Sequence, residues 1–121
     1  MLDRLEAVEQ RFEELNRLMA QPEIAADHQR MQGLAKEQAG ISDLVSKYRE
    51  YKDVARMLKE TRSMLDDGLD EEMTALAKEE VVSLETRFEG LTRDLEAALA
   101  PRDEYADKDV IVEVRAGAGG D

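Results

Sequence analysis

The sequence contains no cysteine, no tryptophan and a single histidine, and aromatic residues make up only 4% of the chain. Without cysteine, disulfide bonds and thiolate metal sites are excluded, and with His28 as the one imidazole a zinc or haem site is not expected. Any core must be aliphatic. No apolar run approaches the about 20 residues that span a bilayer. Because the N-terminus resembles neither a secretory signal nor a transit peptide, we expect a cytoplasmic protein without membrane contact.

Charged residues are abundant, at 38% of the chain, and only two prolines are present. This composition is typical of long helices and coiled coils. The net charge of −12 is unevenly distributed, because residues 66–121 hold 17 acidic and 6 basic side chains whereas residues 1–65 hold 12 and 11. The acidic second half repels phosphate backbones. It favours a basic protein over nucleic acid as a partner of this chain.

Apolar residues recur every three or four positions in three stretches of the chain. This spacing predicts amphipathic helices over about residues 2–20, 27–65 and 70–100. Each helix has one apolar stripe, so none is expected to be stable by itself. The helices must therefore bury their stripes against one another.

Several residues punctuate these stripes. Pro22 predicts either a turn or the first turn of a further helix. Gly33 and Gly40 each cost about 1 kcal/mol relative to alanine inside a helix. We therefore expect the N-terminal third of the second helix to be frayed, kinked or separately started, with Ser42 as a cap for a restart, and continuity across Gly33 to Gly40 is left open. Asp70, followed by two glutamates, predicts a capped N-terminus for the third helix.

The expected architecture is an elongated antiparallel three-helix bundle, or coiled-coil hairpin, over residues 1–101. The short linker after residue 65 predicts that the second and third helices are antiparallel, with the first helix along the same seam. Residues 102–109 read as a polar linker, and the alternating, β-branched residues 110–114 predict a strand without partners. We therefore expect residues 110–121 to be the first strand and glycine-rich turn of a truncated α/β domain.

Three features of the sequence are candidates for chemical sites. The glycines of residues 117–120 lack the third glycine and following helix of a dinucleotide loop, and Asp121 would repel phosphate. The acidic residues between 66 and 80 do not have the spacing of a calcium loop and predict a solvated face. His28 is expected at a helix start, facing solvent or capping. We assign no catalytic, cofactor-binding or metal-binding residue, and no cofactor.

A basic stripe on the second helix has a spacing of three and four residues: Arg49, Lys52, Arg56 and Lys59. Such a stripe can contact RNA or an acidic partner. We favour pairing with the acidic third helix across the antiparallel seam, at the flanking positions of a coiled coil.

The stretch DKDVIVEVRAGAGGD, residues 107–121, resembles the junction in bacterial class I peptide chain release factors where a helical N-terminal domain enters a β-containing central domain. Upstream, YREYKDVARMLKETRSMLDD (residues 48–67) and LDEEMTALAKEEVVSLETRFEGL (residues 69–91) look like the long helical hairpin of that family. With Asp121 after the glycines, the stretch resembles the branch of the family that reads the stop codons UAA and UAG.

The resemblance implies an N-terminal domain of a factor in translation termination on the ribosome. Ester hydrolysis in the family depends on a Gly-Gly-Gln tripeptide and codon reading on a Pro-x-Thr motif, and neither occurs in this sequence, where Asp121 follows Gly119-Gly120. The resemblance thus implies no enzymatic activity in this chain. It implies an auxiliary contact with the stalk-base protein of the large ribosomal subunit, whereas contacts with rRNA and mRNA are expected of the full-length factor.

Two rival functions come from other classes of protein. A free-standing coiled-coil adaptor would self-associate through the same stripes, which sedimentation measures. A nucleotide-dependent enzyme would use the glycine loop and show a thermal shift with nucleotide, which we do not expect.

Overall fold

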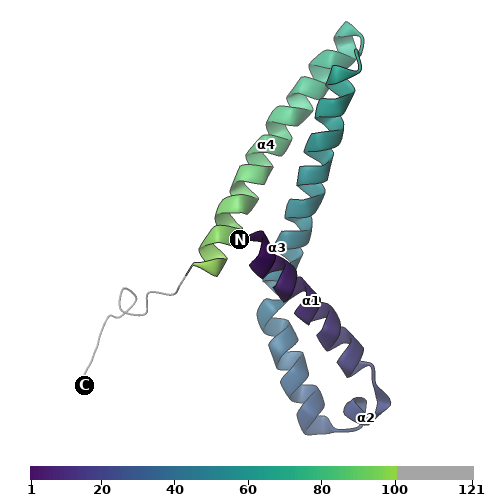
Figure 1. Cartoon of the computed structure of the whole chain (residues 1–121), viewed down its shortest axis with the longest axis vertical. Coiled ribbons are helices and arrows are strands. Elements are labelled where there is room, and N and C mark those ends of the chain that lie inside the picture. Colours follow the sequence, from purple (N-terminus) through teal and green to yellow (C-terminus); the bar gives the residue numbers. More distant parts are fainter. Residues whose placement is uncertain (101–121) are drawn as a thin grey trace, which may run out of the picture.

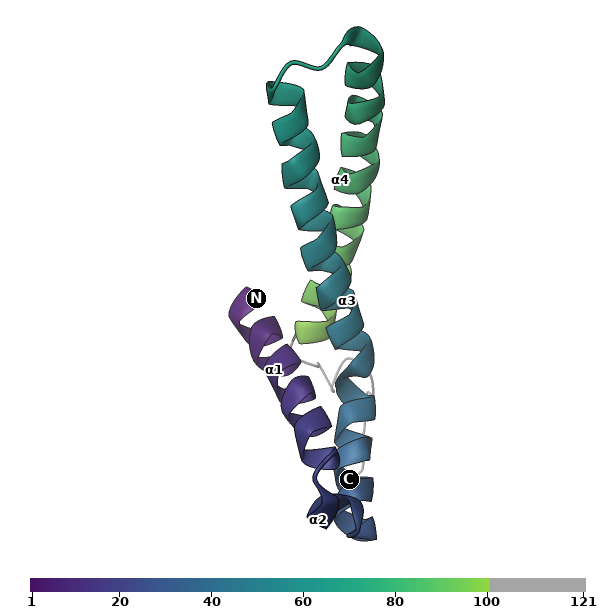
Figure 2. The same cartoon turned by 90° about the vertical axis from the view of Figure 1, so that its right-hand side faces the viewer.

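The computed structural model describes residues 1–100, which form four helices: α1 (Leu2–Met19), α2 (Pro22–Ala25), α3 (His28–Asp66) and α4 (Glu71–Leu99) (Figure 1). Helices α3 and α4 form a long antiparallel hairpin, and α1 runs back along the other end of α3 (Figures 1 and 2). Within residues 1–100, none of the helices has both the length and the apolar character to cross a membrane.

The helix ends follow local side-chain chemistry. The carboxylate of Asp70 accepts a hydrogen bond of 2.8 Å from the backbone N–H of Met73, which confirms the predicted cap of α4. Asp27 caps α3 in the same way: its carboxylate accepts a hydrogen bond of 3.2 Å from the backbone N–H of Arg30. Pro22 is the first residue of the short helix α2, where its missing N–H costs nothing.

Helix α3 is continuous through Gly33 and Gly40, with no restart at Ser42. It has 39 residues and is therefore roughly 58 Å long. A Cβ atom built on either glycine would meet nothing within 4 Å, so neither glycine is needed for close packing. Tertiary contacts with α1 and α2 along this part of α3 offset the low helix propensity of glycine.

The hairpin has an aliphatic core with aromatic residues beside it. Its buried members are Val54 and Leu58 of α3 with Leu84 and Leu91 of α4. Partly buried Tyr51, Met57, Val81 and Phe88 pack around them, and the rings of Tyr51 and Phe88 stack with centroids 4.8 Å apart. Gly68 has a φ of 82° in the connection, a left-handed conformation that favours glycine and reverses the chain between the helices.

The prediction that the first helix lies along the seam between the second and third helices is wrong. Helix α4 packs on the C-terminal part of α3 and α1 on its N-terminal part, so most of the molecule is two helices thick (Figure 2). At 100° per residue, the buried positions of α3 rotate by roughly 130° between residues 31–48 and residues 51–65. The apparent single stripe of α3 is therefore two stripes on different faces, and each face takes one partner helix.

The expected fold class is also corrected in its last part. We expected a bundle followed by a β-strand at residues 110–114, but residues 1–100 contain helices and no strand. The linker, strand and glycine-rich turn were placed at residues 102–121, which lie outside the described residues. Residues 1–100 also offer no sheet edge with which a strand could pair its backbone. The described protein is all-helical.

Candidate functional site

The three long helices meet at one place, which we call the junction: Leu5 of α1, Tyr48 of α3 and Leu95 of α4. All three side chains are buried, with Leu95 fully inaccessible. At 100° per residue, Tyr48 lies between the two faces of α3, so its ring can contact both partner helices. The junction therefore sets the position of α1 relative to the hairpin. Partly buried side chains complete it: Leu44, Tyr51 and Leu99.

A cluster of charged residues, the charged cluster, lies beside the junction and joins α1 to α3. The carboxylate of Glu9 is buried and accepts hydrogen bonds from Arg49 Nε at 2.8 Å and Lys52 Nζ at 2.7 Å. The remaining members are Glu6, Glu13 and the hydroxyl of Tyr48, which donates to Glu6 at 2.9 Å. Because Glu9 has two cationic donors, its burial is compensated.

Aromatic rings support the two cations of this cluster. Lys52 Nζ lies 4.5 Å from the ring centroid of Tyr48, and the guanidinium carbon of Arg49 lies 5.5 Å from that of Phe12. Both distances are within the range of cation–π attraction. The rings hold the cations over Glu9 and reduce the freedom that a long side chain would otherwise have.

Three groups of the charged cluster have pKa values that are shifted away from neutral pH. Hydrogen bonds from Lys52 and then Arg49 lower the pKa of Glu9, against the opposing effect of its burial. The hydrogen bond to Glu9 raises the pKa of Lys52, and burial raises the pKa of Tyr48. None of these shifts brings a group toward neutral pH. The cluster therefore fastens α1 to α3 and is not arranged for acid–base catalysis.

The basic stripe predicted from the sequence does not pair with α4. Its residues are Arg49, Lys52, Arg56 and Lys59. The first two bind Glu9 of α1, and Arg56 lies 3.5 Å from Asp53 and from Glu60 on α3 itself. Counted at 100° per residue, the stripe lies roughly 140–220° around α3 from Val54 in the hairpin core. Arg49, Lys52 and Arg56 therefore face away from the hairpin core, whereas Lys59 lines a hollow that Glu85 and Glu89 of α4 also line.

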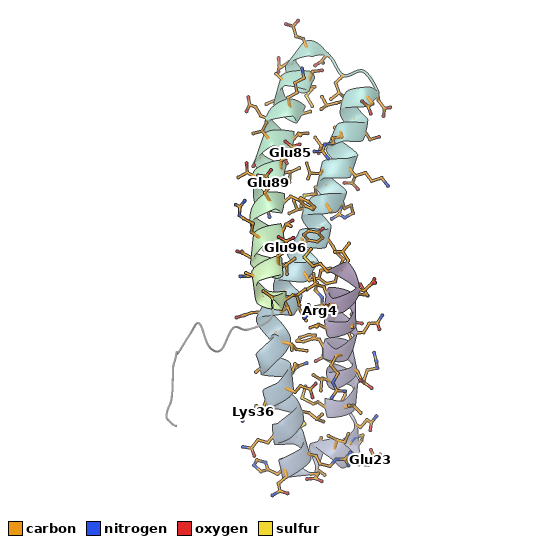
Figure 3. The ribbon with its side chains drawn as sticks, turned by 60° about the vertical axis from the view of Figure 1, so that its left-hand side comes forward. Arg4, Glu23, Lys36, Glu85, Glu89 and Glu96 are labelled. Carbon is orange, nitrogen blue, oxygen red and sulfur yellow. The ribbon has the colours of Figure 1, made fainter. Side chains whose placement is uncertain are left out.

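Other residues form the ion pairs of the hairpin. Lys47 lies 3.7 Å from Asp94, Glu50 lies 3.2 Å from Arg87, and Arg62 pairs with Glu85. These side chains are about half exposed, so each pair contributes little to stability, about 0–1 kcal/mol. The α4 face that carries Glu85 also carries Glu89 and Glu96 (Figure 3).

The remaining sequence candidates do not come together in a site. His28 is the first residue of α3 and is exposed, and the capping side chain there is Asp27. Among residues 1–100, no group of three or more histidine, aspartate or glutamate side chains has an arrangement that could hold a metal ion. The glycines of residues 117–120 and Asp121 lie outside the described residues.

These features define a class of protein. A rod of paired antiparallel helices, with its charges engaged in helix–helix contacts, is an elongated helical module. Residues 8–121 match the PCRF domain family. The chain belongs to this family.

Relatives in several bacteria are similar along the whole chain. Peptide chain release factor 1 of Bacillus thuringiensis subsp. konkukian is 50% identical over all 121 residues, and that of Listeria welshimeri is 46% identical over the same length. These matches confirm the resemblance to bacterial class I peptide chain release factors that the sequence predicted. The chain spans 34% of the length of both relatives. No solved structure matches it.

Proposed function

We propose that this chain is the N-terminal helical domain of a class I peptide chain release factor that directs translation termination at UAA and UAG in the cytoplasm. The observation that carries the proposal is identity of 46–50% along all 121 residues with proteins named peptide chain release factor 1. Asp121 after the glycines supports the UAA and UAG branch. Residues 1–101 are the proposed domain, with a linker at 102–109 and the start of a central domain at 110–121.

The proposed role of this domain is to contact the ribosome and not to catalyse ester hydrolysis. The 121 residues contain neither a Gly-Gly-Gln tripeptide nor a Pro-x-Thr motif. The relatives are about three times as long, which leaves room for both activities in other parts of the factor. The paired charges of the charged cluster support a structural use of the ionisable groups near the junction.

The proposed partner is the ribosome, through the stalk-base protein of the large subunit. The chain has a net charge of −12, which suits a basic ribosomal protein better than rRNA. The full-length factor would contact rRNA and mRNA through its other domains.

A peptide-release assay on programmed ribosomes tests this proposal with three proteins: the intact factor, the factor without residues 1–100, and the chain of residues 1–121. We expect no release by the chain alone. We expect the shortened factor to retain hydrolysis at saturating concentration but to bind ribosomes more weakly. Hydrolysis by residues 1–121, or unchanged ribosome binding after the deletion, would refute the proposed role.

A further inference from the structure

The far end of the α3–α4 hairpin exposes large apolar side chains. Among residues 1–100, six large hydrophobic residues are exposed, and four of them lie between residues 64 and 82. Their exposed fractions run from 44% to 63%: Met64, Met73, Leu76 and Val82. Exposed apolar residues scattered singly are ordinary, but a contiguous group marks an interaction surface.

These side chains border a groove, which we call the end groove. It has a volume of about 500 Å³, and its apolar lining comes from Met64 at the end of α3, Leu69 in the connection, and Met73, Leu76 and Ala77 of α4. A second hollow, with Val82 in its lining, shares Glu79 and Ser83 with the first, so the two hollows adjoin on α4. Two methionines make the groove adaptable in shape.

Within residues 1–100, the end groove has no third helix to cover it. Helix α1 packs at the opposite end of α3, and both views of the ribbon show α1 far from the connection between α3 and α4 (Figures 1 and 2). Elsewhere in the molecule, the junction shows how a third helix buries apolar residues of this kind. The groove is therefore open among the described residues, and an amphipathic helix laid in it would bury its apolar side chains.

The charge around the end groove selects the partner. Between residues 64 and 83, seven side chains are acidic and Lys78 is the one basic residue, which gives a local net charge of −6. The acidic residues are Asp66, Asp67, Asp70, Glu71, Glu72, Glu79 and Glu80. This field repels nucleic acid, anionic lipid and a second copy of the chain, and it attracts a cationic protein.

The two sides of the groove differ. Glu79 and Glu80 line it on α4, whereas on the α3 side Met64 also borders a hollow lined by two basic residues, Arg56 and Lys59, and by one acidic residue, Glu60. A partner helix with basic residues along one flank would therefore bind with that flank over α4. The apolar anchors of the helix would enter between Met64 of α3 and the α4 side chains Met73 and Leu76.

We propose that the end groove binds a basic amphipathic helix of a partner protein, with apolar side chains at a spacing of three and four residues in the groove and lysine or arginine residues against Glu79 and Glu80. The inference rests on the proposed function for its setting, because it names the surface and chemistry of the ribosomal contact. The binding itself is a property of the isolated chain.

A peptide titration tests the groove without the ribosome. The probe is an 18-residue helical peptide with leucines on one face and lysines on the other, and the comparison peptide keeps the leucines but replaces each lysine with glutamate. By NMR of the chain of residues 1–121, we expect the basic peptide to shift the signals of Met64, Met73 and Leu76. We expect its affinity to exceed that of the acidic peptide by at least about tenfold. Equal affinities, or shifts centred elsewhere, would overturn the proposal.

Matched variants separate groove contacts from general effects. Leu76→Ser should weaken basic-peptide binding by about tenfold, whereas Leu2→Ser, at a leucine of similar exposure, should not. The double change Glu79→Lys and Glu80→Lys should also weaken it, and Glu89→Lys with Glu96→Lys gives the same change in net charge farther along α4 (Figure 3). If both double variants lose binding equally, long-range charge and not the groove is responsible, and the proposal is wrong.

Two further measurements distinguish this inference from the proposed function. If residues 1–121 bind purified large ribosomal subunits and Leu76→Ser binds equally well, the function stands and the groove is not its contact. If the basic peptide binds the groove but large subunits do not bind the chain, the groove stands and the proposed function fails. Concentration-dependent self-association in sedimentation that Leu76→Ser abolishes, or binding of naked rRNA at the groove, would replace the partner helix with a second copy or RNA.

Discussion

The two halves of α3 are held by different kinds of contact. Against α4, the core is aliphatic, with Val54, Leu58, Leu84 and Leu91 buried and the ion pairs exposed at the margin. Against α1, a buried glutamate bonded to two cations lies beside the apolar contacts. Apolar contacts do not depend on protonation or on the screening of charge, whereas charged contacts depend on both. We therefore expect the packing of α4 on α3 to be less sensitive to pH and ionic strength than the packing of α1 on α3.

The largest expected effect comes from breaking the hairpin core. Leu84 is 2% exposed, and Leu84→Ala should lower the free energy of unfolding by about 2–5 kcal/mol, because it removes apolar burial and leaves a cavity. Urea unfolding followed by circular dichroism measures this. Leu76→Ala, at a leucine that is 54% exposed, is the control and should change stability by less than about 0.5 kcal/mol. A loss below about 1 kcal/mol for Leu84→Ala would contradict the described core.

A smaller effect is expected from Glu9→Gln, which removes the shared acceptor of Arg49 and Lys52. The two cations are about half exposed and can turn to solvent, so the loss should be about 1–2 kcal/mol and not the 3–5 kcal/mol of a fully buried pair. Amide exchange should accelerate in α1 and remain unchanged in α4. Glu13→Gln, at the more exposed end of the cluster, is the control. Equal acceleration in both helices would show that α1 and the hairpin unfold together.

The smallest and most selective effect is expected from acid. The pKa of Glu9 lies below its ordinary value of 4.5, so its ionised form stabilises the docked state of α1. That contribution is fully present above pH 4.5 and is lost as the pH falls through the lowered pKa of the folded state. Proton titration by NMR should show α1 signals changing in this window before those of α4. The change should be reduced in Glu9→Gln, and an unchanged α1 response in that variant would assign the effect to other carboxylates.

The sequence predicted much of the local structure. The stripes and their breaks indicated the helical regions, and the carboxylate of Asp70 was correctly placed as a cap because capping depends only on residues close in sequence. The glycine-rich stretch of residues 107–121 and the residues of the hairpin indicated the family, which the comparisons confirm. In each case the information lies within one short segment.

Predictions about which segments contact each other were weaker. We placed Arg49 and Lys52 opposite α4, but they bind Glu9 of α1. The signal was present in the sequence, because a count at 100° per residue sets these side chains opposite Val54. Periodicity also gave no warning that Met73 and Leu76, which continue the stripe of α4, are exposed. A stripe indicates an apolar face and does not say whether a partner covers it.

Sequence by itself determined where helices form, where they end, the concentration of acidic charge in the second half of the chain and the family to which the chain belongs. Only the tertiary structure decided that α1 and α4 occupy different faces and different lengths of α3, that Glu9 joins two cations, and that the hairpin end has an open apolar groove. Helix formation and capping depend on interactions within a few residues, whereas helix pairing is a competition among distant surfaces that is resolved only when the whole chain packs.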